Sequence, residues 1–293
     1  MRTRFFCMMP RRIWILVVLV FLSTGASAAQ EQRIRQQLPV LENIRGRFTF
    51  IVFGDNRSGD ETYRKLVAMA MERKPEFILN IGDMIDKPGD LEQWSNFWEM
   101  SRPITVPYFM AVGNHDVHPK VPLSDRTYSE QVDLPGNELY YSFVAGNSLF
   151  IVLDSHLKGQ EKKIVGEQRA WLERLLATSN KRHVFVFLHH PLYTDLGKGH
   201  HAHDSLDKYP ENRDSLEALF AKYKITAVFA GHEHYYQRRT VDGILHIITG
   251  GGGAPMYDRE EDGGFYHFVR VTVEGDKISG EVVDINGKIR DRF

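Results

Sequence analysis

Metal-competent side chains follow five short apolar runs of the sequence, in this order: Asp55, Asp83, Asn114, His189, and the pair His232 and His234. In α/β folds, side chains beyond the carboxyl ends of the strands converge at one edge of the sheet. Oxygen donors mixed with imidazoles, without thiolates, suit Mn, Fe or Zn. Taken alone, Asp55 fits a turn or a helix cap, and His232-Glu233-His234 fits a surface tract. The ordered set at matching strand ends predicts a metal site.

The elements that must position these residues alternate between strand and helix patterns. Strand-length apolar runs precede the polar tips at 48–53, 77–81, 108–112, 184–188 and 227–230. Helical spacing of apolar residues occurs at 66–71, 94–98, 171–176 and 216–223. Asp90 and Gln93 resemble a capping box that opens the second of these helices. Glycine precedes four of the tips and allows the backbone to turn sharply there.

The rest of the chain completes an α/β plan without a dividing linker. Residues 140–144 and 149–153 predict a β-hairpin, and the polar stretch 117–138 predicts a long loop. The runs at 245–248, 268–273 and 278–283 alternate like antiparallel strands. We therefore expect a single domain over residues 48–293, preceded by a polar lead-in segment at 29–47.

The first 28 residues have the pattern of a cleaved signal peptide. Four arginines precede an unbroken apolar run of ten residues, Ile13–Leu22, and Ala26-Ser27-Ala28 offers a cleavage site. That run is shorter than the roughly 20 apolar residues of a membrane-spanning helix. We expect an exported protein, periplasmic or secreted, that would contact a membrane only if the leader remained uncleaved.

Composition excludes several classes of protein. The chain has 37 basic and 38 acidic residues, which gives no electrostatic signature of nucleic-acid binding. Its only cysteine, Cys7, lies in the leader and cannot form a disulfide within the chain. Hydrophobic residues make up 42% of the chain, a share typical of a globular domain. The oligomeric state stays open.

The polar tips together resemble the calcineurin-like metallophosphoesterases. The motifs, in chain order, are Gly54-Asp55, Gly82-Asp83-Met84-Ile85-Asp86, Gly113-Asn114-His115-Asp116, His189, and Gly231-His232-Glu233-His234. The stretches 188–191 and 231–238 are most similar to the purple acid phosphatase branch. The resemblance covers about residues 48–253. It implies a four-layer α/β/β/α sandwich, in which helices cover two packed mixed sheets.

The resemblance also implies a dinuclear centre that holds two ions of Mn, Fe or Zn. Asp83 would bridge the ions, Asp55 and His234 would complete one shell, and Asn114, His189 and His232 would complete the other. A hydroxide between the ions would attack the phosphorus. His115 would protonate the leaving group without binding metal, and Asp86 would orient His115.

Two departures from the family pattern concern the first metal. Many members carry D-x-H in the first motif, where this chain has Asp55-Asn56-Arg57. Purple members place a tyrosine in the second motif, where this chain has Asp86. The first metal would therefore bind more weakly and lack a tyrosinate ligand. Arg57 either neutralises substrate phosphate, which guanidinium matches in shape, or is a surface arginine in a turn.

A second histidine group, His200, His201 and His203, follows His189 at the distance where purple phosphatases carry histidines that contact substrate. It is alternatively a solvated loop or an adventitious metal tract. His190 is expected to support its neighbour His189. The run 249–255 lacks the lysine of a phosphate-binding P-loop and predicts a turn close to the site.

These features predict an exported, metal-dependent hydrolase of phosphate mono- or diesters that acts on a small substrate. One alternative is a nucleotide or cyclic-nucleotide phosphodiesterase outside the cytoplasm. The other is a metal-holding binding module without catalysis. Turnover of aryl monophosphates and bis-aryl phosphates, with and without Mn, separates the three.

Overall fold

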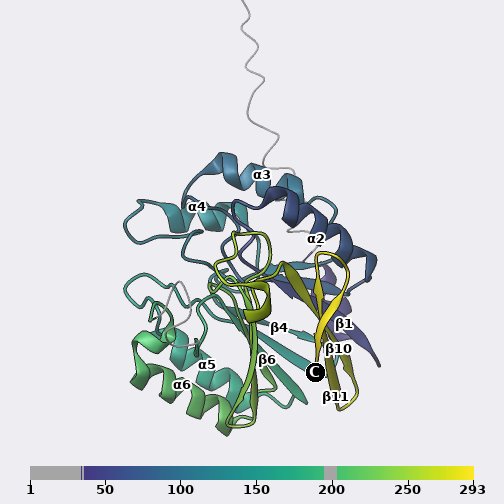
Figure 1. The fold of residues 1–293 in the computed structure, drawn as a ribbon. Helices are drawn as coiled ribbons and strands as arrows, with labels where there is room; N and C mark the ends of the chain where they lie inside the picture. The colour runs from purple at the N-terminus through teal and green to yellow at the C-terminus, as the bar shows by residue number, and fades with distance from the viewer. Residues whose placement is uncertain (1–33, 35, 195–202) are drawn as a thin grey trace, which may run out of the picture.

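The computed structural model describes residue 34, residues 36–194 and residues 203–293 (Figure 1). Its strands are β1 Phe48–Phe53, β2 Phe77–Asn80, β3 Tyr108–Met110, β4 Tyr141–Ala145, β5 Ser148–Val152, β6 His183–Leu188, β7 Ala227–Ala230, β8 Tyr236–Val241, β9 Ile244–Thr249, β10 His267–Glu274, β11 Lys277–Asp284 and β12 Ile289–Arg292. Its longer helices are α2 Asp60–Glu72, α3 Leu91–Ser101, α4 Ser124–Gln131, α5 Gly166–Thr178 and α6 Pro210–Lys222. Residues 36–42 are also helical.

The strands form two six-stranded mixed sheets, in the orders β12-β11-β10-β1-β2-β3 and β4-β5-β6-β7-β9-β8. Helices α2 and α3 lie over the first sheet, and α5 and α6 lie over the second (Figure 1). The predicted four-layer α/β/β/α sandwich is therefore confirmed.

Aromatic side chains fill the space between the two sheets. Phe50 and Phe77 of the first sheet contact Phe150 of the second, with ring centroids 5.1 and 5.0 Å apart. All three rings are fully buried. Edge-to-face pairs of this kind add about 0.5–1.5 kcal/mol beyond the area they bury. This interior fixes how one sheet sits on the other.

Parallel pairing places the polar tips at one edge of each sheet. β1, β2 and β3 pair in parallel in the first sheet, as do β5, β6 and β7 in the second. The carboxyl ends of these strands lead directly to the predicted metal-binding residues. Because the sheets pack face to face, the two rows of tips meet between them.

Two predictions about local structure were wrong or incomplete. The predicted loop 117–138 contains α4, whose buried Tyr128 packs against Trp94 with ring centroids 5.9 Å apart. β9 pairs antiparallel with β8 but in parallel with β7, so the C-terminal part is not wholly antiparallel. Tertiary pairing overrides what alternation along one strand can indicate.

The predicted cap of α3 forms only in part. The carboxylate of Asp90 accepts hydrogen bonds from the backbone N–H groups of Glu92 and Gln93. The Gln93 side chain does not return to the Asp90 backbone as a capping box requires. Its Oε1 instead accepts from the N–H groups of Asp86 and Lys87, which ties the helix to the loop after β2.

The predicted leader, residues 1–28, lies outside the described residues. Within the described part of the chain, no helix combines the length and the apolar character needed to cross a membrane. The lead-in segment is anchored to the core, because the helical residue Leu41 is 3% exposed.

Candidate metal centre

The loops that carry the tips approach one another so closely that glycine is required beside them. A Cβ atom on Gly113 would lie 2.2 Å from the backbone nitrogen of Asp83. A Cβ on Gly231 would lie 2.3 Å from Oδ2 of Asp55. The close approach at these two glycines is thus a property of the fold.

Three of the tip residues adopt left-handed backbone conformations. The φ angles of Asp55, Asp83 and His232 are 59°, 58° and 67°. Such conformations cost non-glycine residues of order 1–3 kcal/mol and cluster at functional sites. The surrounding fold therefore holds these side chains in place at the expense of stability.

One buried group consists of Asp55, Asp83 and His234, whose ligand atoms all lie within 4.8 Å of one another. Nε2 of His234 lies 3.7 Å from Oδ1 of Asp55. The Asp55 carboxylate also accepts the backbone N–H of His232 at 3.0 Å. This group combines two carboxylates with one imidazole.

The other group centres on the amide oxygen of Asn114. That oxygen lies 3.0 Å from Nε2 of His189 and 2.9 Å from Nδ1 of His232. Nε2 of His189 is also 3.4 Å from Oδ1 of Asp83, which places Asp83 between the two groups. His190, expected only to support His189, has a ring nitrogen within 4.8 Å of those of His189 and His232.

The donor set fits metal ions. Nδ1 of His189 contacts the carbonyl of Ile81 at 2.9 Å, and Nδ1 of His234 contacts that of Pro255 at 2.8 Å. A backbone carbonyl on one ring nitrogen fixes the tautomer and directs the other nitrogen toward a metal, the usual arrangement for ligating histidines. Carboxylate, amide and imidazole donors suit Mn, Fe or Zn.

Buried negative charge also favours cations here. Burial and the neighbouring Asp83 raise the pKa of Asp55 well above its usual value. Burial also disfavours the charged form of Asp83, but His189, His115 and Arg57 outweigh it and lower the pKa of Asp83. Both carboxylates share the positive charge of Arg57. A bound cation would add positive charge and favour the ionised form of both.

Arg57 and Asp86 lie at the mouth of the first group. Nε of Arg57 is 3.3 Å from Oδ2 of Asp83, and Nη1 is 2.9 Å from Oδ1 of Asp86. The Arg57 side chain is only 11% exposed, so it is not a surface arginine in a turn. Its positive charge lies against the carboxylate that the two groups share.

His115 contacts the backbone of Asp86 more closely than its side chain. Nδ1 of His115 lies 2.8 Å from the Asp86 carbonyl and 3.9 Å from the Asp86 carboxylate. The backbone N–H of His115 donates to Oδ1 of Asp83 at 3.0 Å. The ring is 30% exposed and belongs to neither ligand group. The expected orienting contact therefore comes from the Asp86 carbonyl.

Asp116 holds together the loops that carry the centre, a role that was not expected from the sequence. Its buried carboxylate accepts four backbone N–H groups, from Gly113, Asp83, Met84 and Ile85. The only sequence signal was its place in the Gly113–Asp116 motif. These bonds join the loops after β2 and β3.

Asp116→Asn is expected to lower the free energy of unfolding of the metal-free protein by about 2–3 kcal/mol, because an amide N–H group would face backbone donors. Urea unfolding in the presence of a chelator measures the change. Asp125→Asn, at an exposed acid of α4, is the control. Equal stability of the two variants would contradict this role of Asp116.

Several groups near the centre carried no usable sequence signal. Tyr257 stacks on His234 with ring centroids 4.7 Å apart and is 41% exposed. Lys162 pairs with Asp204, whose Oδ2 lies 4.0 Å from Nε2 of His232. Their partners are far apart in sequence, so only the fold brings them together.

Of the second histidine group, His200 and His201 lie outside the described residues, and His203 is exposed. The run 249–255 forms the expected turn beside the site: the N–H of Gly252 donates to the Gly54 carbonyl at 2.8 Å, and that of Ala254 to the Asp55 carbonyl at 2.7 Å.

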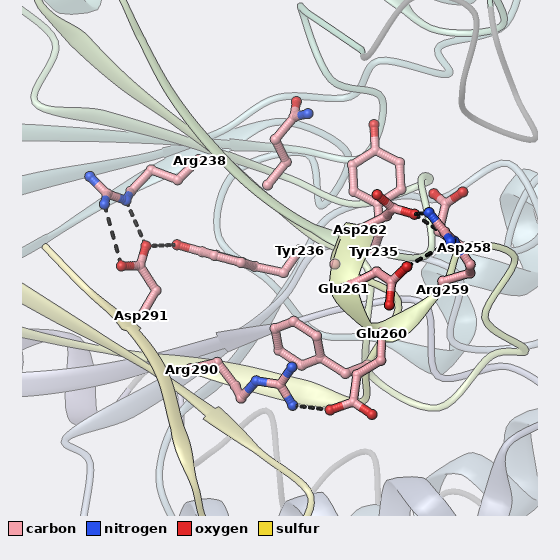
Figure 2. Close-up of a pocket in the computed structure, with 13 residues that line it drawn as sticks. Tyr235, Tyr236, Arg238, Asp258, Arg259, Glu260, Glu261, Asp262, Arg290 and Asp291 are labelled. Carbon is pink, nitrogen blue, oxygen red and sulfur yellow. Dashed lines mark hydrogen bonds and ion pairs between the residues drawn. The ribbon is translucent and has the colours of Figure 1, made fainter.

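A pocket of about 730 Å³ is lined by side chains that include Tyr235, the residue next to His234 in the sequence (Figure 2). Its three arginines each pair with an acid: Arg238 with Asp291, Arg259 with Asp262, and Arg290 with Glu260. Their charge is therefore already balanced, and the pocket does not compete with the histidine and carboxylate groups as a site for phosphate.

Comparisons with known proteins agree with this geometry. The family model of the calcineurin-like phosphoesterases matches residues 48–236. Two Arabidopsis thaliana proteins are similar in sequence: "Probable inactive purple acid phosphatase 1" is 28% identical over 63% of this chain and 35% of its own length, and "Purple acid phosphatase 23" is 29% identical over 55% and 37%. The chain thus spans about a third of these relatives.

A solved structure shows the same fold. The purple acid phosphatase PPD1 from yellow lupin (Lupinus luteus) seeds superposes with a TM-score of 0.70 at 20% identity, over 85% of this chain and 54% of its own. The family model covers well over half of the 293 residues. The chain belongs to the calcineurin-like phosphoesterase family, and within it is similar to the purple acid phosphatases.

Proposed function

We propose that this protein hydrolyses phosphate esters at a dinuclear metal centre built by the two ligand groups. The observation that carries the proposal is the position of Asp83, which belongs to the group with Asp55 and His234 and lies 3.4 Å from Nε2 of His189 in the other. One carboxylate between two donor sets is what a pair of ions requires.

Asp55, Asp83 and His234 would hold one ion, and Asn114, His189 and His232 the other, with His190 as a further nitrogen donor near the second. When bound, two such cations would neutralise phosphoryl oxygens and would acidify a water nucleophile. The chain's own residues would orient the ester, exclude competing groups and supply the leaving-group proton.

His115 would donate that proton. Its Nδ1 is held by the Asp86 carbonyl and its ring is partly exposed at the edge of the centre. A histidine held through one nitrogen presents the other in a fixed direction, as a general acid must. His203, with His200 and His201, would contact the substrate.

Arg57 would neutralise charge in place of the missing histidine ligand. Arg57→His restores the D-x-H pattern and is expected to raise affinity for the more weakly bound Mn²⁺ ion by about 10–100-fold, the range typical of changes around a metal's ligands. Equilibrium dialysis at buffered free Mn²⁺ measures this affinity.

The control for Arg57→His is Arg57→Gln, which removes the same positive charge without adding an imidazole nitrogen. If the Mn²⁺ affinity depends only on the charge at position 57, the two variants should have equal affinity. If they bind Mn²⁺ equally tightly, position 57 lies outside the reach of the first ion.

The substrate proposal is a small phosphate mono- or diester outside the cytoplasm, after removal of residues 1–28. Assays with an aryl monophosphate and a bis-aryl phosphate, in Mn²⁺ and in chelator, test it. We expect metal-dependent turnover of at least one substrate. Turnover of the diester alone would favour a phosphodiesterase, and no turnover with any metal would favour a non-catalytic metal-binding module.

A further inference from the structure

His156 is a buried histidine whose ring nitrogens lack hydrogen-bond partners. The residue is 7% exposed, and neither Nδ1 nor Nε2 has such a partner among the described residues. An unsatisfied buried polar group costs roughly 1–3 kcal/mol. Leucine or phenylalanine would fill the same volume without that cost. A ligand bound to a ring nitrogen of His156 would offset the cost.

Two other histidine rings flank His156. Its ring centroid lies 6.1 Å from that of His118 and 5.6 Å from that of His190. The rings come from the loops after β3, β5 and β6, at the edge of the sheets that carries the metal centre. With metal–nitrogen bonds of about 2.0–2.1 Å, the centroids of two rings that share an ion lie about 5–6.5 Å apart, and the upper end of this range corresponds to a wide N–metal–N angle.

Each flanking ring has a contact at its Nδ1, but the two rings have different neighbours. Nδ1 of His118 accepts the backbone N–H of Lys120 at 3.2 Å, which orients its Nε2 away from that turn. Nδ1 of His190 contacts Ser155 Oγ at 2.9 Å, and the same ring lies 4.4 Å from that of His232 in the metal centre. His118 is thus the ring that can pair with His156, whereas His190 belongs to the centre.

The loop that carries His156 is held rigidly. The carboxylate of Asp154 accepts the backbone N–H of His156 at 2.7 Å. The side-chain amide of Gln168, on α5, accepts the N–H of Asp154 at 2.8 Å and donates to its carbonyl at 2.9 Å. A ligand fixed in this way loses little conformational entropy on binding, as metal sites require.

The chemistry of the pair selects the ion. A neutral imidazole binds a metal through the lone pair of one ring nitrogen, and both ring nitrogens of His156 are without a hydrogen-bond partner among the described residues. A site of imidazoles without carboxylates suits Zn²⁺, Cu²⁺ or Ni²⁺ and disfavours Mg²⁺ and Ca²⁺. Water or a substrate oxygen would fill the remaining coordination positions.

We propose that His118 and His156 form an additional binding site for a zinc-class divalent cation beside the dinuclear centre. The site is distinct from both ligand groups of that centre and does not depend on catalysis. It would place a further positive charge between the loops after β3 and β5, where an anionic substrate could share it.

Zinc content of the full-length protein tests this site. Chelator-stripped protein is dialysed against buffered free Zn²⁺, and bound zinc is counted by mass spectrometry. We expect His156→Leu and His118→Leu each to bind one equivalent less than wild type. His183→Gln is the matched control, because His183 is equally buried but starts β6 at the opposite end of the sheet. Unchanged zinc content in both variants overturns the proposal.

Two further comparisons keep the outcomes separate. Asp83→Asn should lose zinc from the dinuclear centre while retaining the equivalent that depends on His156. If Asp83→Asn changes nothing and His156→Leu still loses one equivalent, the dinuclear proposal fails and the additional site stands. If thermal denaturation shows that His156→Leu does not fold, the test depends on His118→Leu, because His118 is only half-buried. Full zinc content in His118→Leu would then reject the site.

Discussion

Asp83→Asn is expected to reduce kcat for phosphate ester hydrolysis to below about 1% of the wild-type value, since even residues outside the ligand shell typically cost 10–100-fold. Asp83 is the carboxylate that joins the two ligand groups, and it lies 3.3 Å from Arg57. Asparagine keeps the shape but removes the negative charge. Both ions would lose a shared ligand, and Arg57 would repel the first ion without compensation.

Steady-state kinetics at saturating Mn²⁺, with metal content measured on the same sample, checks this expectation. Asp284→Asn is the control, because Asp284, the last residue of β11, is also a buried carboxylate that accepts backbone N–H groups, here from the turn before β12. Loss of activity in Asp83→Asn with full metal content would assign Asp83 a catalytic role other than bridging. If Asp83→Asn retains both its activity and its metal content, Asp83 is not part of the metal centre.

His115→Asn is expected to lower kcat for alkyl phosphates by about 10²–10⁴-fold, the usual contribution of a positioned general acid. Alkoxide leaving groups need a proton, whereas nitrophenolate does not. The loss on an aryl phosphate with a good leaving group should therefore be much smaller. Metal content should be unchanged, because His115 belongs to neither ligand group.

The informative quantity is the ratio of the two losses, since a merely structural defect lowers both rates equally. His183→Asn, remote from the centre, provides the baseline. Hydrolysis of alkyl phosphates at the wild-type rate by His115→Asn would show that the proton comes from elsewhere. Tyr257 and His203 would then be the next groups to examine.

The strand-end residues could be predicted from the sequence because their environment is local. An apolar run followed by glycine and an acid or histidine specifies a buried strand, a sharp turn and a polar tip. Parallel pairing then brings Asp55, Asp83 and Asn114 to one edge of a sheet. The order of these elements indicated an α/β fold, and the family resemblance implied the four-layer sandwich.

Contacts that depend on how the loops pack could not be predicted in this way. Arg57 and Asp86 are 29 residues apart, and their 2.9 Å contact arises only when the loops after β1 and β2 meet. His156 follows β5, a strand whose end bears none of the family motifs, so nothing local distinguished it from a core histidine. Helix α4 was missed because its eight residues are mostly polar.

The position of Arg57 connects the missing histidine of the first motif with the expected metal affinity of the first site. In the absence of a D-x-H histidine, the guanidinium shares Asp83 and Asp86 with any ion that enters the first site. Metal binding must displace or tolerate that positive charge. We therefore expect the two ions to bind with unequal affinity, the weaker one being the ion held by Asp55, Asp83 and His234.

The most direct test of the metal-dependent phosphoesterase proposal is reconstitution of activity from the stripped protein. Aryl phosphate hydrolysis is followed while Mn²⁺ or Zn²⁺ is added to chelator-treated enzyme, and bound metal is counted at each step. The account predicts no turnover without metal, and activity that rises as the second ion of the dinuclear centre binds. Turnover that survives complete removal of metal would contradict it, as would a fully metal-loaded protein without activity.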